Sequence, residues 1–132
     1  MVKAILTKEI SIDTPNGVGI AAKVAQLVSG QAKANIRAAW ASGVNGSGHF
    51  SLITDANQKV MDALKGEFPK LKEQDVLVFD VKNALGDIAM VTEQLSKANL
   101  NINYLYTTYV DEKPALILST DDNKKALGLF SH

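Results

Sequence analysis

The chain matches itself when it is shifted by 66 residues, which is half of its length of 132 residues. At this shift the segment 54–57 (Thr-Asp-Ala-Asn) falls on 120–123 (Thr-Asp-Asp-Asn), and Asn35-Ile36 falls on Asn101-Ile102. A fixed internal period indicates a supersecondary unit that occurs twice. The fold must therefore accommodate two related halves.

Hydrophobic periodicity predicts that each half reads strand, helix, strand, strand, helix. The predicted ranges are 4–12, 20–29, 34–42, 50–53 and 56–65 in the first half, and 75–81, 87–98, 101–110, 115–118 and 122–129 in the second. The first helices align best at a shift of 68, so we expect about two additional residues in the first half. Gly30 and Asn99 are expected to end these helices in the left-handed conformation. Asp55 and Asp121 are expected to cap the helices that follow them.

This order of elements is typical of the split βαβ, ferredoxin-like arrangement, an α+β fold with both helices on one face of an antiparallel sheet. Residues 68–71 are a candidate fourth strand for the first half. The second half has no corresponding segment, so either its sheet is one strand short or another strand, such as the N-terminal one, fills the gap. We therefore predict two tandem domains, residues 1–72 and 73–132, the second without an assigned last strand.

Composition excludes several classes of protein. The chain has no cysteine, which excludes disulfides, thiolate metal sites, iron–sulfur clusters and thiol nucleophiles. Its 14 basic and 14 acidic side chains balance, which argues against nucleic acid as the main partner. Its apolar runs are far shorter than the ~20 residues that cross a bilayer, and no secretory signal opens the chain. We expect a cytoplasmic protein with no membrane partner and no cofactor.

Candidate catalytic and metal-binding residues are few. The two histidines, His49 and His132, have no partner at metal-ligand or general-base spacing in the sequence. The stretch 43–48 is rich in glycine, but it precedes a predicted strand instead of a helix, so we interpret it as a hairpin turn and not a phosphate loop. Asp121 and Asp122 are best explained as helix caps. We expect no catalytic residue, no metal site and no enzymatic activity.

The first turn of each half is the remaining candidate for a binding site. In the first half, residues 13–19 contain Pro15, Asn16, Gly17 and Gly19, which favour unusual backbone geometry and bring bare amides close to a ligand. Such amides suit a carboxylate. The corresponding turn, residues 82–87, is shorter and has one glycine. From composition alone an ordinary loop remains open for both turns.

The second half resembles the ACT domain. That family typically has Asn/Asp-x-Pro-Gly-x-Leu in its first turn and Asn-Ile at the opening of its second strand. Here the pattern is Asn83-x-x-Gly86-x-Ile88, followed by Asn101-Ile102, and the first half is similar through Asp13-x-Pro15 and Asn35-Ile36. The resemblance spans residues 4–66 and 74–130. It implies a non-catalytic regulatory module that binds a small molecule, most often an amino acid, between paired domains.

The resemblance also implies which residues contact the ligand: the first turn of one domain and the opening of the second strand of its neighbour. One predicted set consists of Thr14, Pro15, Asn16, Gly17, Val18 and Gly19 with Asn101, Ile102 and Asn103. The reciprocal set consists of Asn83, Ala84, Leu85, Gly86 and Asp87 with Asn35 and Ile36. Because the two turns differ, we expect one of the two sites to bind better than the other.

The sequence thus predicts a stand-alone amino-acid sensor that acts through self-association, as in a homodimer, or through a regulated partner protein. The alternative is a non-catalytic interaction or assembly module whose ligand sites are vestigial.

Overall fold

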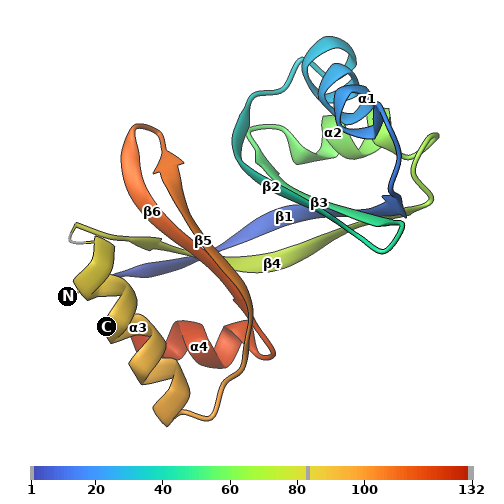
Figure 1. Cartoon of the computed structure of the whole chain (residues 1–132). Helices are drawn as coiled ribbons and strands as arrows, with labels where there is room; N and C mark the ends of the chain where they lie inside the picture. Colours follow the sequence, from blue (N-terminus) through green and yellow to red (C-terminus); the bar gives the residue numbers. More distant parts are fainter. Residues whose placement is uncertain (1, 83, 131–132) are drawn as a thin grey trace. The chain divides into compact units, whose positions relative to one another are not determined.

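The computed structural model describes residues 2–82 and 84–130, and Figure 1 shows their helices and strands. By its internal contacts the chain divides into two compact units. The N-terminal unit is Lys8–Gln74, and the C-terminal unit combines Met1–Thr7 with Asp75–His132. These ranges differ from the predicted domains, 1–72 and 73–132, because the first residues of the chain belong to the C-terminal unit.

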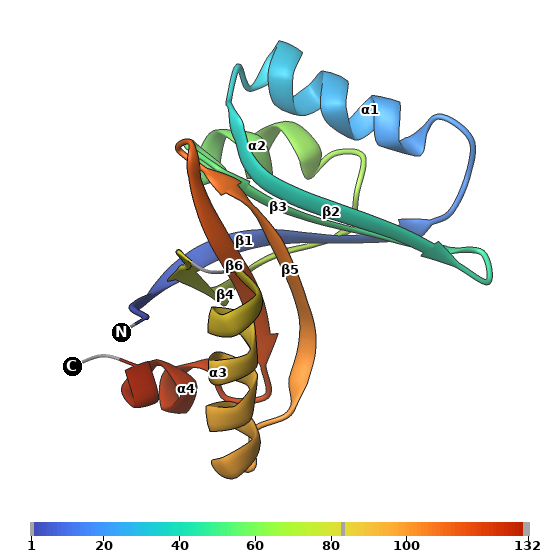
Figure 2. The same cartoon turned by 60° about the vertical axis from the view of Figure 1, so that its left-hand side comes forward.

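The N-terminal unit has two helices on one face of an antiparallel sheet, as Figure 2 shows for α1 and α2 above β2 and β3. Its neighbouring strands are β2, β3, β1 and β4, in that order. The elements are β1 (Ala4–Pro15), α1 (Ile20–Gln26), the π-helical turn η1 (Leu27–Gln31), β2 (Ile36–Val44), β3 (Ser47–Thr54), α2 (Asn57–Leu64) and β4 (Lys70–Asp80). Residues 8–15 of β1 and 70–74 of β4 lie in this unit.

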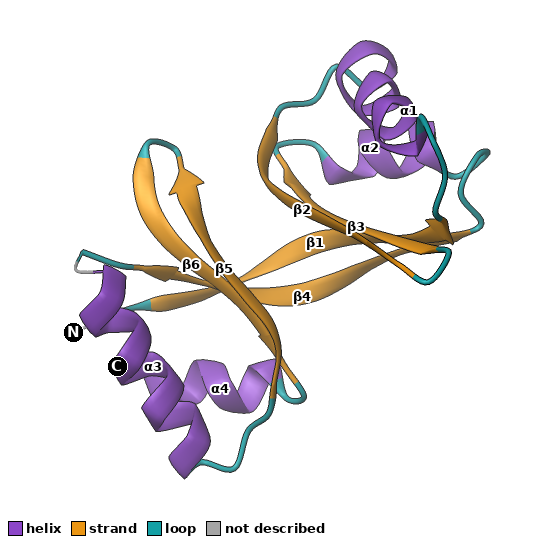
Figure 3. Cartoon of the chain, viewed as in Figure 1, coloured by secondary structure: helices purple, strands orange, loops and turns teal. Residues whose placement is uncertain are grey.

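The C-terminal unit repeats this arrangement with β5, β6, β4 and β1 as neighbouring strands (Figure 3). Its remaining elements are α3 (Ala84–Lys97), β5 (Ile102–Val110), β6 (Lys113–Thr120) and α4 (Asn123–Phe130). The N–H of Asp80 in β4 donates to the carbonyl of Lys3 at 3.2 Å. The N-terminal residues of β1 therefore fill the place of the fourth strand that the second half of the sequence lacks.

The predicted fold is confirmed: both units have the ferredoxin-like order of strands and helices. The two long strands explain how one chain completes both sheets. Residues 4–7 of β1 serve the C-terminal unit and residues 8–15 serve the N-terminal unit, whereas β4 divides between the units at residues 74 and 75. Within the described residues, no helix combines the length and hydropathy needed to cross a membrane.

Each unit has its own hydrophobic core between its helices and its sheet. In the N-terminal unit, fully buried Ile10 and Ile12 of β1 pack with Val28 and Leu64 from the helical layer. In the C-terminal unit, Phe79 of β4 packs edge-on against Phe130 of α4, with ring centroids 4.9 Å apart. Burial of one such side chain stabilises a fold by roughly 1.5–3 kcal/mol. These cores fix the helices over the sheet and thereby position the turns.

The repeated Thr-Asp-x-Asn segment makes the same hydrogen bonds in both units. The side-chain oxygen of Asn57 accepts from the N–H and the hydroxyl of Thr54, at 3.2 and 2.6 Å, while its amide nitrogen donates to the Lys8 carbonyl at 3.1 Å. Asn123 bonds in the same way to Thr120, at 2.8 and 2.9 Å, and to the Asp75 carbonyl at 2.9 Å. In both units this asparagine therefore joins the second helix to the first strand.

The ends of α1 and α3 correct two predictions. Asn99 has the expected left-handed conformation, with φ 58°, but in the N-terminal unit the left-handed residue is Lys33, with φ 54°, and not Gly30. Buried Val28 and Leu95 accept the closing hydrogen bonds from Ala34 and Leu100, respectively. Val28 and Leu95, which occupy the same place in the two helices, are 67 residues apart, so the predicted shift of 68 residues between the helices is wrong. The π-helical turn η1 absorbs the one additional residue.

The predicted cap at Asp55 is also wrong. The N-cap residue of α2 is Ala56, which makes no side-chain capping bond, and its N–H donates to the hydroxyl of Thr54 at 3.2 Å. In α4 the carboxylate of Asp122 accepts from the N–H of Lys125 at 3.1 Å, so the cap at Asp122 is confirmed. The carboxylates of Asp55 and Asp121 instead contact the openings of β2 and β5.

Candidate functional site

The first turn of the N-terminal unit is fixed to the neighbouring hairpin. The N–H of Asn16 donates to the carbonyl of Gly46 at 2.9 Å, between β2 and β3. The side chain of Asn16 lies over Gly43, where an added Cβ would stand 2.6 Å from its Nδ2 atom. Gly19 closes the turn with φ 87°, a conformation that favours glycine. The turn is thus held at both of its ends.

The backbone N–H groups that follow Asn16 in this turn are free to bind a ligand. Among the described residues, the N–H groups of Gly17, Val18 and Gly19 donate to no acceptor. The side chain of Val18 is fully exposed, and the first turn of the following helix carries no acidic residue. Consecutive unpaired N–H groups form a favourable place for an anion such as a carboxylate.

Two hollows flank this turn. An apolar hollow is lined by Asn16, Gly17, Gly19, Ile20, Ala21, Ala22, Ala41, Ser42, Gly43 and Phe50. A charged hollow is lined by Asp13, Thr14, Pro15, Gly46, Ser47, Gly48, Glu67, Pro69 and Lys70. The predicted site residues of this turn therefore divide between two different surroundings.

The corresponding turn of the C-terminal unit is largely helical. Helix α3 begins at Ala84, three residues before the predicted start at residue 87, so Leu85, Gly86 and Asp87 form its first turn. Asn83 lies outside the described residues. The carboxylate of Asp87 accepts from the N–H of Lys82 at 2.8 Å. The start of α3 therefore already carries a negative charge. The residue that corresponds to Asp87 in the N-terminal unit, 67 residues earlier in the chain, is the uncharged Ile20.

The opening of β2 is engaged within its own unit. The N–H and the side-chain amide of Asn35 donate to the carboxylate of Asp55 at 2.9 and 3.1 Å. The backbone N–H of Asn35 lowers the pKa of Asp55 below its usual value by more than desolvation raises it, and the Asn35 amide and the charge of Arg37 act in the same direction. Ile36 is exposed beside them.

The opening of β5 differs from that of β2 in the hydrogen bonding of the asparagine side chain. The N–H of Asn101 donates to Asp121 at 3.3 Å, as at Asn35, but the side-chain amide of Asn101 makes no hydrogen bond with any residue that the structure describes. Ile102 is half-buried and Asn103 is exposed. Asn101 faces a hollow lined by Thr92, Ser96, Asn99, Leu100, Asn101, Ile102 and Asp121. Its amide is therefore available to a ligand.

Within the N-terminal unit the turn and the strand opening are far apart. The turn contacts Gly46, directly after the end of β2, whereas Asn35 stands directly before the start of β2. The full length of a nine-residue strand lies between them. This unit therefore does not bring its own turn and its own strand opening together.

His49 has partners that sequence reasoning missed. Its Nδ1 atom lies 2.8 Å from Oδ1 of Asp13, its Nε2 atom lies 2.7 Å from Oγ of Ser51, and the ring of Trp40 stands 4.8 Å from the imidazole. Sequence spacing could not indicate these partners, because the register of β1 against β3 sets Asp13 opposite His49. These distances resemble a serine-hydrolase triad, but Ser51 is fully buried, so its hydroxyl is closed to an external substrate.

No group of three or more His, Asp and Glu side chains within residues 2–82 and 84–130 could hold a metal ion. Among the predicted site residues that the structure describes, the turn amides and the side-chain amide of Asn101 are unpaired. This arrangement suits binding of a small polar molecule.

The sequence model of the ACT domain pair family matches residues 5–130. The chain belongs to the ACT domain pair family. The resemblance predicted from Asn83, Gly86 and the Asn-Ile openings is confirmed. No curated protein matches the chain.

Several solved structures share the fold of this ACT domain pair. Protein BT0572 from Bacteroides thetaiotaomicron is 22% identical, with a TM-score of 0.82 over 96% of this chain and 87% of that chain. The regulatory subunit of aspartate kinase from Thermus thermophilus is 18% identical, with a TM-score of 0.68 over 97% and 93%. That from Thermus flavus is 19% identical, with a TM-score of 0.63 over 96% and 92%. Both Thermus proteins are regulatory subunits.

Proposed function

We propose that this ACT domain pair is a regulatory sensor that binds an amino acid at an interface between ACT domains. The observation that carries the proposal is the row of unpaired N–H groups at Gly17, Val18 and Gly19. Three adjacent donors match the two oxygens of a ligand carboxylate. Membership of the family and the likeness to regulatory subunits support a regulatory role over a catalytic one.

The ligand contacts are proposed to come from different domains, since the N-terminal unit does not bring its own turn and strand opening together. The turn Thr14–Gly19 would hold the carboxylate, and Asn101–Asn103 would supply the amide oxygen of Asn101 to the ammonium group. The reciprocal site would join residues 83–87 with Asn35 and Ile36. The two domains of a site belong either to one chain or to two chains of a homodimer.

The first of these two sites is proposed to bind more tightly. In the reciprocal site the amide of Asn35 is already bonded to Asp55, whereas the amide of Asn101 is free among the described residues. The carboxylate of Asp87 would repel the ligand carboxylate at the start of α3, whereas the first turn of α1 has no acidic residue. We therefore expect one tightly bound ligand per chain.

An assembly module without a ligand is the second candidate. The observation that favours it is that β2 and β5 are edge strands at the two ends of the strand order. An edge strand presents unpaired backbone groups that pair with another chain. Homodimerisation through such an edge fits both candidates.

Thermal unfolding in the presence of each of the twenty amino acids at millimolar concentration tests the proposal. A ligand that binds the native state raises the midpoint by mass action, so at least one amino acid should raise it while the others do not. A midpoint that responds to none of the twenty would overturn the sensor and favour the assembly module. Analytical ultracentrifugation of the same samples then shows whether the chain self-associates.

A further inference from the structure

We propose that the ligand of this chain is an amino acid with an uncharged, aliphatic side chain, and that the apolar hollow beside the first turn receives that side chain. The inference rests on the proposed function, because it names the ligand class for the same turn. The lining of this hollow includes half-buried Ile20 and Phe50 and exposed Ala21, Ala22 and Ala41.

The position of the free donors selects this hollow over the charged one. Gly17 and Gly19, whose N–H groups are unpaired among the described residues, line the apolar hollow. Thr14 and Pro15 line the charged hollow, but they lie in β1, where Thr14 pairs with Gly48, and proline has no N–H. A carboxylate held by the free donors therefore directs the remainder of the ligand towards the apolar hollow.

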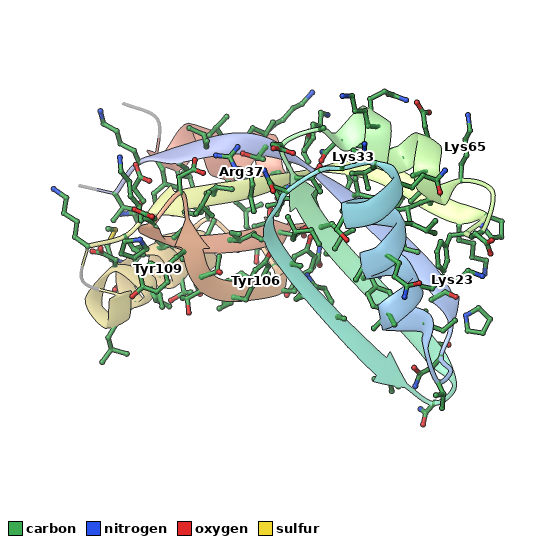
Figure 4. All side chains as sticks on the ribbon, turned by 90° about the horizontal axis from the view of Figure 1, so that it is seen from above. Lys23, Lys33, Arg37, Lys65, Tyr106 and Tyr109 are labelled. Atoms are coloured by element: carbon green, nitrogen blue, oxygen red, sulfur yellow. The ribbon has the colours of Figure 1, made fainter. Side chains whose placement is uncertain are left out.

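The chemistry of the lining selects the side chain. The residues around the apolar hollow include no aspartate, glutamate, lysine, arginine or histidine. Lys23, the charged residue of α1 labelled in Figure 4, is paired with Glu67 at 2.6 Å. A charged ligand side chain would lose water in this hollow and find only the neutral polar groups of Asn16 and Ser42, with no opposite charge, whereas an aliphatic side chain would gain from burial. The alanines leave about 420 Å³ open, which is room for such a group.

The repeat supplies a matched control for this hollow. At the offset of 67 residues, Ala22 of α1 corresponds to Ala89 of α3, and both are exposed helical alanines. A methionine at either position meets the same requirements of helix formation. The two substitutions therefore differ in that one fills the proposed subsite and the other does not.

The first experiment is titration calorimetry of the full chain with valine, isoleucine, leucine, lysine, arginine, aspartate and glutamate. An aliphatic member should bind at least about tenfold more tightly than every charged one. Preferential binding of lysine, arginine, aspartate or glutamate would overturn the inference and leave the proposed function standing. The thermal-unfolding screen of all twenty amino acids tests the proposed function separately, and no response to any of them would overturn that function.

The second experiment compares Ala22→Met with Ala89→Met, using the aliphatic amino acid that binds best. The Ala22→Met variant should lose about tenfold in affinity or more, because the methionine side chain occupies the hollow, and Ala89→Met should stay within about twofold. Equal affinities for both variants would overturn the assignment of the hollow. Circular dichroism melting of both variants establishes that each is folded.

Discussion

Asn35 donates two hydrogen bonds to Asp55, from its backbone N–H at 2.9 Å and from its side-chain amide at 3.1 Å. These bonds join the residue before β2 to the residue after β3 and use the side chain that would otherwise face a ligand. The repeat-related pair, Asn101 and Asp121, keeps the backbone bond alone among the described residues. The two copies of this sequence motif thus differ in whether the asparagine side chain is available to a ligand.

Acid should weaken the fold through Asp55. Its pKa is lowered in the folded state, mainly by the N–H of Asn35, so the ionised carboxylate stabilises the native chain. This contribution is complete above the unfolded-state pKa of about 3.9 and is lost as the pH falls through the lower folded value. Urea unfolding between about pH 5 and pH 2 should show a shallower loss of stability in Asp55→Asn than in the natural chain.

The control for Asp55→Asn is Asp62→Asn. The carboxylate of Asp62 accepts from the side chain of Gln58 and lies in the middle of α2. The Asp62→Asn substitution removes one negative charge from the same unit, as Asp55→Asn does, but it leaves the contacts at the opening of β2 unchanged. Identical pH slopes for Asp55→Asn and the natural chain would show that the Asn35 contact has no energetic effect.

Asn101→Ala should reduce amino-acid affinity more than Asn35→Ala does. The amide of Asn101 is unpaired within the described part of the chain, whereas that of Asn35 is bonded to Asp55. Loss of one hydrogen bond to a charged ligand group costs about 1.5–3 kcal/mol, or roughly tenfold to a hundredfold in affinity. Titration calorimetry measures both variants; a larger loss in Asn35→Ala would reverse our ranking of the two sites.

Sequence reasoning predicted the fold because its signals are local and occur twice. The Thr-Asp-x-Asn segment, the helical spacing and the two hairpins each depend on neighbouring residues, and they determine the order of elements. The π-helical turn η1 escaped prediction, because one inserted residue can be absorbed at many positions of a helix. Completion of the second sheet by the N-terminal strand remained an alternative, since strand pairing depends on contacts distant in sequence. The continuous strand β4, which spans the predicted segments 68–71 and 75–81 and serves both units, was not predicted.

The candidate site was predicted less completely than the fold, because several of its contacts join residues that are distant in sequence. The turn Thr14–Gly19 has a local signature in its proline and glycines. The side chain of Asn35 is hydrogen-bonded to Asp55, twenty residues away, and the partners of His49 depend on strand register. A one-residue change of register would have turned Asp13 and His49 to opposite faces of the sheet.

Asn57→Ala should destabilise the chain by about 1–3 kcal/mol. The substitution removes the acceptor of the Thr54 N–H and hydroxyl and one donor to the carbonyl of Lys8. Gln58→Ala, the next residue on the exposed side of α2, should change stability by less than about 0.5 kcal/mol. Chemical denaturation compares the two; equal midpoints would mean that the repeated asparagine does not join helix to strand.

Gly43→Ala should weaken binding at the first turn without unfolding the chain. The added Cβ would stand 2.6 Å from Nδ2 of Asn16, so this side chain must move and the turn with it. We expect several-fold lower affinity for the amino acid that binds best. Gly30→Ala is the control, because no atom lies within 4 Å of its added Cβ. Unchanged affinity in Gly43→Ala would show that Asn16 does not shape the site.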